Sequence, residues 1–472
     1  MALFSFLDRE RSIAEPGYTR WLIPPAALAI HLCIGQVYAF SVFKLPLTKL
    51  LGITASAPGD WPQEQIAIIF SIAIVFLGLS AAVFGAWLER VGPRRAMFTA
   101  ACCFGGGFLV GAVGIATHMF WLLVLGYGVL GGIGLGIGYI SPVSTLIKWF
   151  PDRPGLATGL AIMGFGGGAM IGSPLSVALM NFYKTATTTG VAQTFATMGV
   201  IYFLFMMFGV FSIRLPRKDW APAGYVPPAT PHGMITTHQV SVNEAMRTPQ
   251  FYLLWICLCV NVTAGIGILE QASPMIQEMF KPKITAAAAA GFVGLLSLAN
   301  MLGRFGWSSF SDVIGRKATY ATFFTVGAIC YWFIPKIGDS GSVAIFVLVA
   351  VVVISMYGGG FATIPAYLRD MFGTMQVGAI HGRLLTAWST AGVLGPLLVN
   401  ELRAAQIAKG AVGSDVYAVS MHVMTGLLLI GFIANMLVRP VKESHWFVGT
   451  SETGTFHGPT STTTTAGAGV HT

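Results

Sequence analysis

Charged side chains are scarce in this 472-residue sequence, which is 55% apolar but only 10% Asp, Glu, Lys and Arg. A soluble protein carries about 25% charged residues, so the composition excludes an ordinary soluble globular protein. Long polar stretches are also missing over most of the chain, which resolves into roughly a dozen apolar runs long enough to cross a membrane. We therefore predict an all-α membrane protein with twelve transmembrane helices.

Recognisable motifs for catalysis, metal binding and nucleotide binding are missing as well. The six cysteines lie within apolar runs, without the spacing of a metal site or a disulfide framework. Two glycine-rich segments, Gly131 to Gly134 and Gly166 to Gly168, lie inside apolar helices with no preceding strand and no P-loop lysine, so they do not predict phosphate binding. No catalytic triad is visible. We expect no enzyme activity, no cofactor and no metal.

The formal net charge of +9 does not indicate nucleic-acid binding, because the basic residues stand at the ends of the predicted helices rather than in one patch. Clusters such as Arg94-Arg95 and Arg316-Lys317 fall in alternate connections, and the positive-inside rule assigns those connections to the cytoplasm. The polar start, Asp8 to Arg11, runs directly into a full-length span, so no cleavable signal peptide is predicted. We expect a multi-pass protein of the plasma membrane, a bacterial inner membrane, with both termini in the cytoplasm.

The prediction divides the chain into two six-helix halves, residues 1–214 and 249–442, joined by a polar, proline-containing cytoplasmic linker at 215–248. Residues 443–472 are rich in threonine, glycine and serine and have too little apolar content to pack, which predicts a disordered tail. The spans are expected at about 20–45, 64–87, 96–117, 120–149, 155–181, 194–214, 250–276, 288–310, 318–335, 343–368, 382–402 and 417–438.

An internal duplication supports this division. An acid-x-x-Gly pattern occurs at Glu89–Gly92 and again at Asp312–Gly315, 223 residues later, and Gly159 and Gly382 show the same offset. Because one constant offset relates separate landmarks, we predict two repeats of six helices with a site at their interface near the midplane of the membrane.

The stretch from Ser297 to Lys317 places a cation inside the apolar part of a membrane helix. Arg304 precedes Asp312, where the helix meets water, by eight residues, which is about 12 Å along an α-helix. An arginine at that depth costs about 2.5–3.5 kcal/mol, and such residues face an interior cavity. Polar residues recur on its helical face: Ser297, Asn300, Arg304 and Ser308. We predict that Arg304 binds a small organic anion, with a structural ion pair as the alternative.

The segment from Gly85 to Arg95 (GAWLERVGPRR) resembles the loop signature between helices two and three of the major facilitator superfamily, with Glu89 where the family usually has aspartate. The resemblance implies the major facilitator fold, two pseudo-symmetric six-helix bundles. It also implies that carboxylates and basic residues at this loop and its repeat hold an inner gate. The gating residues expected on this basis are Gly85, Glu89, Arg90, Gly92, Arg94, Asp312, Gly315 and Arg316.

Two further segments, Lys148 to Ala157 (KWFPDRPGLA) and Met246 to Phe251 (MRTPQF), resemble signatures of the bacterial oxalate/formate antiporter family, which is related to the proton-coupled monocarboxylate transporters. The likeness runs through almost the whole chain except the tail. It implies a transporter whose carboxylate substrate is held by basic and aromatic residues. Arg304 matches the family's substrate-binding arginine, and the matching aromatic positions are Tyr38, Tyr139, Phe165, Tyr357 and Phe361.

The sequence departs from this family at two positions. Where oxalate carriers have a second cationic residue, a lysine in helix eleven, this sequence has Trp388. A dianion would then meet a single fixed cation, so a monocarboxylate such as lactate, pyruvate or formate is favoured over oxalate. Proton-coupled relatives often carry an aspartate four residues before the arginine; here Asn300 stands there, which leaves Arg304 without that counter-ion and ready for a substrate carboxylate.

Other intramembrane polar residues have competing roles. Glu270 and His31 are groups that can titrate, and we take both as proton-coupling candidates; contact with lipid headgroups and helix packing are the respective alternatives. His381 and Arg383 are expected near the cytoplasmic mouth, as gate or snorkelling residues. For the aromatic residues and Trp388, packing inside the bundle is the alternative to substrate contact.

These observations predict a monomeric secondary active transporter of small carboxylates in the lipid bilayer. It would work by alternating access, as a proton symporter or as an exchanger of anions. An oxalate/formate-type dicarboxylate exchanger is the first alternative, and a major facilitator carrier of another organic solute, such as a sugar or a drug, is the second. A membrane receptor or scaffold that transports nothing is the third.

Overall fold

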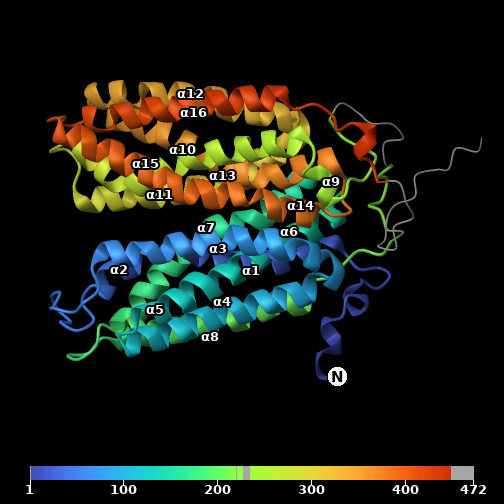
Figure 1. Ribbon diagram of the computed structural model, residues 1–472, viewed down its shortest axis with the longest axis horizontal. Helices are drawn as coiled ribbons and strands as arrows, with labels where there is room; N and C mark the ends of the chain where they lie inside the picture. The colour runs from blue at the N-terminus through green and yellow to red at the C-terminus, as the bar shows by residue number, and fades with distance from the viewer. Residues whose placement is uncertain (1, 219, 227–233, 448–472) are drawn as a thin grey trace, which may run out of the picture.

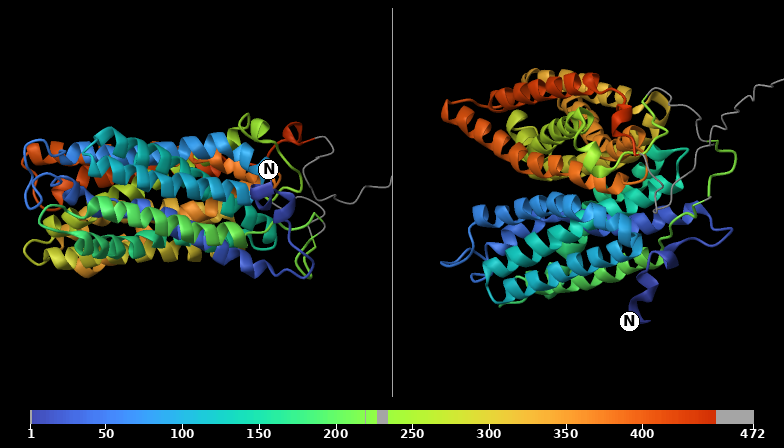
Figure 2. Two further views of the ribbon diagram at one scale, coloured as in Figure 1. Left: turned by 90° about the horizontal axis from the view of Figure 1, so that it is seen from below. Right: turned by 45° about the vertical axis from the view of Figure 1, so that its right-hand side comes forward.

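The computed structural model describes residues 2–218, 220–226 and 234–447. These residues form a helical molecule in which the N-terminal half of the chain lies beside the C-terminal half (Figure 1). The N-terminus, the segment that connects the halves and the last described residues all lie at one end of the helices, which we call the terminal end. The opposite end, where residues 48–62 connect two helices, is the far end (Figures 1 and 2).

Six spans make up the N-terminal half. The first is interrupted by a 3-10 stretch and the fourth by a π-helical stretch, so the half has more helical elements than spans. The elements are α1 (Ile23–Ile34), η4 (Gly35–Ala39), α2 (Ser41–Leu47), α3 (Gln63–Val91), α4 (Pro93–Ala116), α5 (Phe120–Leu123), η5 (Val124–Gly131), α6 (Gly132–Trp149), α7 (Pro154–Tyr183) and α8 (Val191–Ser212).

The C-terminal half repeats this plan. Its main elements are α10 (Pro249–Met279), α11 (Ala286–Ile314), α12 (Arg316–Asp339), α13 (Val343–Phe372), α14 (Val377–Leu384), α15 (Thr386–Ala408) and α16 (Asp415–Leu437). Within the described part of the chain, eleven helical stretches are long and apolar enough to cross a membrane. The remaining predicted span, at 382–402, is built from α14 and α15, which are separated at Leu385.

The internal duplication is confirmed by the helix bounds. Adding 223 to the bounds of α3 gives those of α11, adding it to those of α4 gives those of α12, and the stretch Phe120–Trp149 corresponds in the same way to α13. The turns between these helices repeat as well. Gly92 and Gly315 have φ angles of 84° and 86°, a region that only glycine occupies without strain, so each ends one helix and lets the next begin at once.

At the terminal end, the predicted linker and the start of the predicted tail both pack against the C-terminal half. In the linker, Thr236 and Val240 donate backbone hydrogen bonds of 2.8 and 2.9 Å to the end of α13. The 3-10 helix η6 (Glu443–His445) follows α16, and the Trp446 ring stacks on His238 with 3.6 Å between ring centroids. The first residues of the predicted tail therefore pack on the linker, whereas 448–472 lie outside the described residues.

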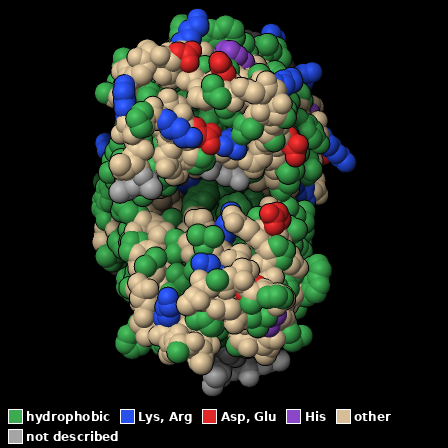
Figure 3. All heavy atoms as spheres, turned by 90° about the vertical axis from the view of Figure 1, so that its left-hand side faces the viewer, with side chains coloured by type: hydrophobic (Ala, Val, Ile, Leu, Met, Phe, Trp, Pro, Cys, Tyr) green, Lys and Arg blue, Asp and Glu red, His purple; other side chains and the backbone are tan. Residues whose placement is uncertain are grey.

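The halves meet along α3 and α7 of one and α11, α13, α14 and α15 of the other. Their close approaches lie in the middle and towards the terminal end, where an ideal Cβ on Gly85 would lie 2.8 Å from Ala379 Cα. Seen from the far end, a hollow separates the two halves (Figure 3). The molecule is therefore closed at its terminal end and hollowed at its far end.

Candidate functional site

The side chain of Arg304 lies between the two halves. It projects from α11, is fully buried, and donates a hydrogen bond of 3.1 Å from Nε to Oδ1 of Asn300. Its guanidinium carbon lies 4.9 Å from the ring centroid of Phe361 and 5.6 Å from that of Phe165, both within the range of a cation–π contact. The guanidinium of Arg304 is therefore held by one hydrogen bond, to Asn300, and by contacts with two aromatic rings.

The two terminal nitrogens of Arg304 are left without a partner. No described residue accepts a hydrogen bond of good geometry from Nη1 or Nη2, although the hydroxyls of Tyr38 and Tyr139 lie close enough to interact with the guanidinium. Buried polar groups are normally hydrogen-bonded, and an arginine fork binds a carboxylate through two parallel bonds. The unpaired fork thus points to an anionic ligand with two oxygen acceptors.

Small residues on α7 allow α11 to bring Arg304 this close to the N-terminal half. An ideal Cβ on Gly166 would lie 3.1 Å from Nε of Arg304, and one on Gly159 would crowd Ser308 and the Arg304 carbonyl. Any larger residue at these two positions would push the helices apart. The glycines of α7 therefore belong to the construction of the site.

A pair of tyrosines lies over the arginine on the side of the far end. The hydroxyls of Tyr38, on η4, and Tyr357, on α13, are 3.2 Å apart and share a hydrogen bond. Because η4 and α13 belong to different halves, this bond joins the halves. Each tyrosine also packs edge-on against a phenylalanine. The ring centroids of Tyr38 and Phe165 are 5.3 Å apart, as are those of Tyr357 and Phe361.

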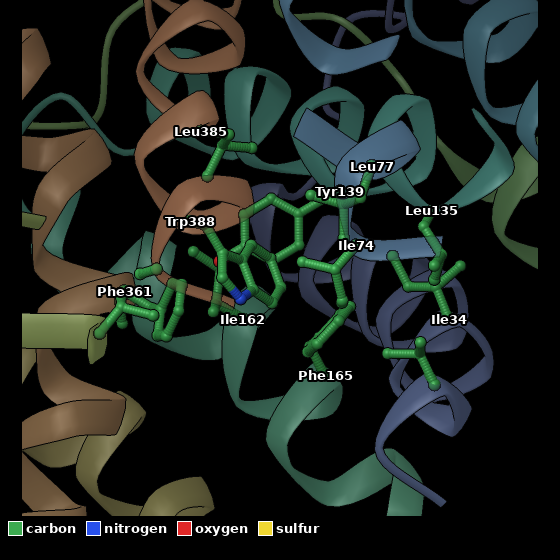
Figure 4. Close-up of a cluster of buried hydrophobic side chains, with 14 of the residues drawn as sticks. Ile34, Ile74, Leu77, Leu135, Tyr139, Ile162, Phe165, Phe361, Leu385 and Trp388 are labelled. Carbon is green, nitrogen blue, oxygen red and sulfur yellow. The ribbon is translucent and has the colours of Figure 1, made fainter. Parts of the chain in front are cut away.

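Trp388 forms an aromatic cluster with residues from both halves (Figure 4). Its ring lies 4.6 Å from Phe361, 5.2 Å from Phe165 and 5.3 Å from Tyr139. Figure 4 shows these side chains pointing towards one another from opposite halves. The indole Nε1 has no hydrogen-bond partner among the described residues, so this cluster offers a donor as well as apolar surface.

Two histidines extend the cluster towards the terminal end. The ring of His31, on α1, lies 5.3 Å from that of Tyr139, and the ring of His381, on α14, lies 5.8 Å from it. His381, expected near the cytoplasmic mouth, is buried one turn after Gly378, a residue at the start of α14. Arg383 does lie at the terminal end, where it donates to Asn243. Glu270 falls in α10, but its side chain lies outside the described residues.

The terminal end is closed by two related contacts. Asp312, near the end of α11, accepts hydrogen bonds of 2.8 Å from the backbone N–H groups of Gly155 and Leu156 at the start of α7. Glu89, near the end of α3, accepts one of 3.0 Å from the N–H of Gly378 at the start of α14. Each carboxylate thus caps a helix of the opposite half, where the helix dipole favours negative charge.

Ion pairs hold these two carboxylates in place. Lys148 donates to Glu89 at 2.6 Å, and Arg316 pairs with both Asp312 and Asp370. Arg94 behaves differently, since it donates to the carbonyls of Phe6, Arg11 and Ile213 within its own half, while Arg90 is exposed. The geometry therefore joins Gly85, Glu89, Asp312 and Arg316 to the interface but not Arg90 or Arg94.

Residues 26–396 match the Major Facilitator Superfamily, which is most of the chain. The protein belongs to the major facilitator superfamily. Since the members of this family are transporters, the prediction of a membrane transporter rather than an enzyme is confirmed, as is the all-helical fold.

Known proteins similar to this major facilitator chain include two bacterial transporters. The uncharacterized transporter YhjX of Escherichia coli is 27% identical over 77% of this chain and 83% of its own. The oxalate:formate antiporter of Oxalobacter formigenes is 25% identical over 90% of this chain and 94% of its own. Among solved structures, the fucose:proton symporter FucP of E. coli superimposes with a TM-score of 0.64 at 12% identity, over 89% of this chain and 99% of the other.

Some contacts in this major facilitator protein were not anticipated from sequence. Ser389 Oγ donates a hydrogen bond of 2.7 Å to the carbonyl of Ile74 in the other half. Its position directly after Trp388 marks the segment, but nothing in the sequence indicates the partner. Gly378 had a usable signal, since it stands 223 residues after Gly155, and both donate to the carboxylate of the opposite half.

Proposed function

We propose that this protein transports small carboxylates, with monocarboxylates such as lactate, pyruvate or formate favoured, by alternating access. The observation that supports the proposal is the buried Arg304, whose Nη1 and Nη2 have no partner and which forms no ion pair among the described residues. A carboxylate fits this fork in charge and geometry. The likeness to an oxalate:formate antiporter agrees with an anionic substrate.

The surroundings of Arg304 favour a substrate with one negative charge over a substrate with two. Arg304 carries the only fixed positive charge among the described residues that form this site. The residues around its guanidinium and around Trp388 are aromatic or neutral. A monocarboxylate neutralises this site, whereas the second charge of oxalate lies in an apolar cluster, where an unpaired charge is costly. The dicarboxylate exchanger is the second candidate, because a relative carries oxalate by name.

In this proposal the terminal end is cytoplasmic and the hollow of Figure 3 opens to the outside of a plasma membrane, a bacterial inner membrane. The substrate reaches Arg304 past Tyr38 and Tyr357, whose shared hydrogen bond must break to admit it. Neutral donors, Tyr139 and Trp388, complete the site, with Asn300 orienting the arginine. The contacts of Glu89 and Asp312 then open so that the anion leaves, by proton symport or by exchange.

The test is uptake of labelled lactate, formate and oxalate into proteoliposomes. Arg304→Ala should raise the half-saturating concentration at least tenfold, because hydrogen bonds to a charged group contribute about 1.5–3 kcal/mol each. Arg304→Lys should recover little, since lysine lacks the planar fork. Arg247→Ala, which removes an exposed arginine whose ion-pair partner among the described residues is Glu244, is the matched control. Wild-type uptake by Arg304→Ala would contradict the proposed site.

A further inference from the structure

Three buried rings near Arg304 carry polar atoms with no partner. They are His31 on α1, Tyr139 on α6 and His381 on α14, each at most 1% exposed. The unpartnered atoms are Nε2 of His31, Oη of Tyr139 and both ring nitrogens of His381. Leaving a buried polar group unsatisfied is unfavourable. Four such atoms in one column of rings indicate that something small binds there during the working cycle.

The hydrogen bond of His31 fixes which of its nitrogens is basic. Nδ1 lies 3.1 Å from the carbonyl oxygen of Ala27, one turn earlier in α1. A carbonyl only accepts, so Nδ1 carries the hydrogen, and Nε2 carries the lone pair. The buried Nε2 is therefore the basic nitrogen of the ring, and the backbone carbonyl of Tyr139 lies close to the same ring.

The position of the column connects the arginine with the terminal end. Arg304 lies within electrostatic range of His31. At the end of the column nearer the terminal end, His381 lies one turn along α14 from Gly378. The N–H of Gly378 donates a hydrogen bond to Glu89, one of the contacts that close the terminal end. His31 and Tyr139 belong to the N-terminal half and His381 to the C-terminal half, so the column crosses the interface that opens and closes.

The neighbouring charged groups are engaged elsewhere. On the elements packed around α1 and α14, the charged side chains lie towards the helix ends. At the terminal end most are held in pairs: Arg20 with Asp152, Lys148 with Glu89, Arg369 with Asp370, and Glu244 with Arg247 and His445. At the far end Glu278 pairs with Arg403, while Glu64 and Glu401 are exposed. Arg383 donates a hydrogen bond to Asn243. Arg90 and Tyr252 are exposed. Tyr202 lies beside Cys33. The nearby titratable hydroxyls are Tyr38, Tyr139 and Tyr357. Of the groups facing the two imidazoles, Arg304 is the fixed charge that acts on His31, and the charged form of His31 in turn acts on His381.

We propose that His31 and His381, with Tyr139 between them, form a proton site that fills only when an anion occupies Arg304; this rests on the proposed carboxylate transport. With the site empty, burial and the charge of Arg304 together oppose a positive charge on the His31 imidazole. A bound carboxylate cancels that charge, and Nε2 of His31 then takes one proton to form an imidazolium. No bond of the substrate changes.

The coupling follows from the same arrangement. One anion and one proton enter together, so the loaded carrier has the same net charge as the empty one. When the halves part at the terminal end, the contact between Tyr139 and His381 breaks and the column meets water. The anion then leaves Arg304, the positive charge of Arg304 returns to full effect, and the proton leaves the imidazole. Transport is therefore electroneutral symport of a monocarboxylate with one proton.

The experiment compares two modes of transport in proteoliposomes loaded with a trapped pH-sensitive dye. The first is net uptake of labelled lactate driven by an inward proton gradient, and the second is exchange of labelled for unlabelled lactate at equal pH. Wild-type protein should acidify the lumen as lactate enters. His31→Gln and His381→Gln, tested separately, should lower gradient-driven uptake at least tenfold more than they lower exchange. His422→Gln, an exposed histidine on α16, should match the wild type.

The outcomes separate the two proposals. Lactate uptake without acidification by the wild type, or equal loss of both modes in folded histidine variants, would overturn the proton site and leave carboxylate transport standing. Unchanged gradient-driven uptake in both variants would also overturn it. Absence of uptake and of exchange for every carboxylate tested with the wild type would overturn both proposals. Thermal unfolding of each variant distinguishes a folded protein from a damaged one.

Discussion

At the scale of residues, the chain departs from an ordinary membrane bundle in having buried polar atoms without partners. Arg304, Trp388, His31 and His381 all have such atoms, and ring contacts connect them through Phe361, Phe165 and Tyr139. Each unpaired group alone would be a defect of about 1–3 kcal/mol. Gathered at the meeting point of two halves, they support our proposal that this region binds a substrate, whose polar atoms would supply the missing partners.

The side chain at position 388 should set the preferred charge of the substrate. Trp388→Lys adds a second cation next to the site, so the ratio of oxalate uptake to lactate uptake should rise about tenfold or more, as expected for one added charge-assisted hydrogen bond. Uptake of the two labelled anions in the same proteoliposomes gives the ratio. Trp388→Phe keeps an aromatic ring without charge and serves as the control. An unchanged ratio in a folded Lys variant would remove the charge argument.

At the scale of elements, helix ends and glycine faces position the site. Gly159 and Gly166 let α11 cross α7 closely, and Gly85 lets α3 approach α14. The carboxylates of Asp312 and Glu89 then cap α7 and α14 from the opposite half. Because helix starts attract negative charge, these two contacts stabilise the closed terminal end without linking the halves permanently.

Loss of one capping charge should loosen this end. Asp312→Asn is expected to speed the reaction of a water-soluble thiol reagent with a cysteine at position 308 about two- to fivefold, since a charge at a helix N-terminus contributes about 0.3–1 kcal/mol. Ser308 is buried at this interface. Glu89→Gln should act in the same direction through α14, and the labelling is measured in a background without the native cysteines.

The far end supplies the control for that measurement. Asp60 accepts backbone hydrogen bonds of 2.8 Å from Leu51 and Ala57, which resembles the bonding of Asp312 but does not join the halves. Asp60→Asn should leave the labelling rate at position 308 unchanged. An equal increase with Asp60→Asn would mean that general destabilisation, rather than the loss of the cap, opens the terminal end.

At the scale of the whole molecule, the halves form two pseudo-symmetric bodies that are closed at one end and hollowed at the other (Figures 1 and 3). Transport by alternating access requires the closed interface to open. The interface between α3 and α15 passes close to the middle of the molecule, where Gly78 lies against Ser389.

A disulfide across this interface should stop the cycle. An ideal Cβ on Gly78 lies 3.1 Å from Cβ of Ser389, near the separation of about 3.5–4.5 Å in disulfides. Oxidised Gly78→Cys/Ser389→Cys should lose nearly all uptake and regain it on reduction, while the two single variants should not respond to oxidant. Uptake by the fully cross-linked protein would exclude opening at this interface as a step of transport.

The sequence alone specified the architecture and the central cation. Apolar length, turn glycines and the offset of 223 act locally or by repetition, so the helices, their pairing between repeats and the buried face of Arg304 could all be predicted before any contact was known. Only the tertiary structure showed the side-chain contacts between segments that are distant in the sequence: Tyr38 with Tyr357, His31 and His381 with Tyr139, and Trp388 with Phe165. These pairs stand far apart in the chain. Trp388 and Phe165 are separated by the repeat offset of 223, but Tyr38 and Tyr357, and the two histidines and Tyr139, are not. Their proximity depends on how two separately folded halves lie against each other, which no local pattern encodes.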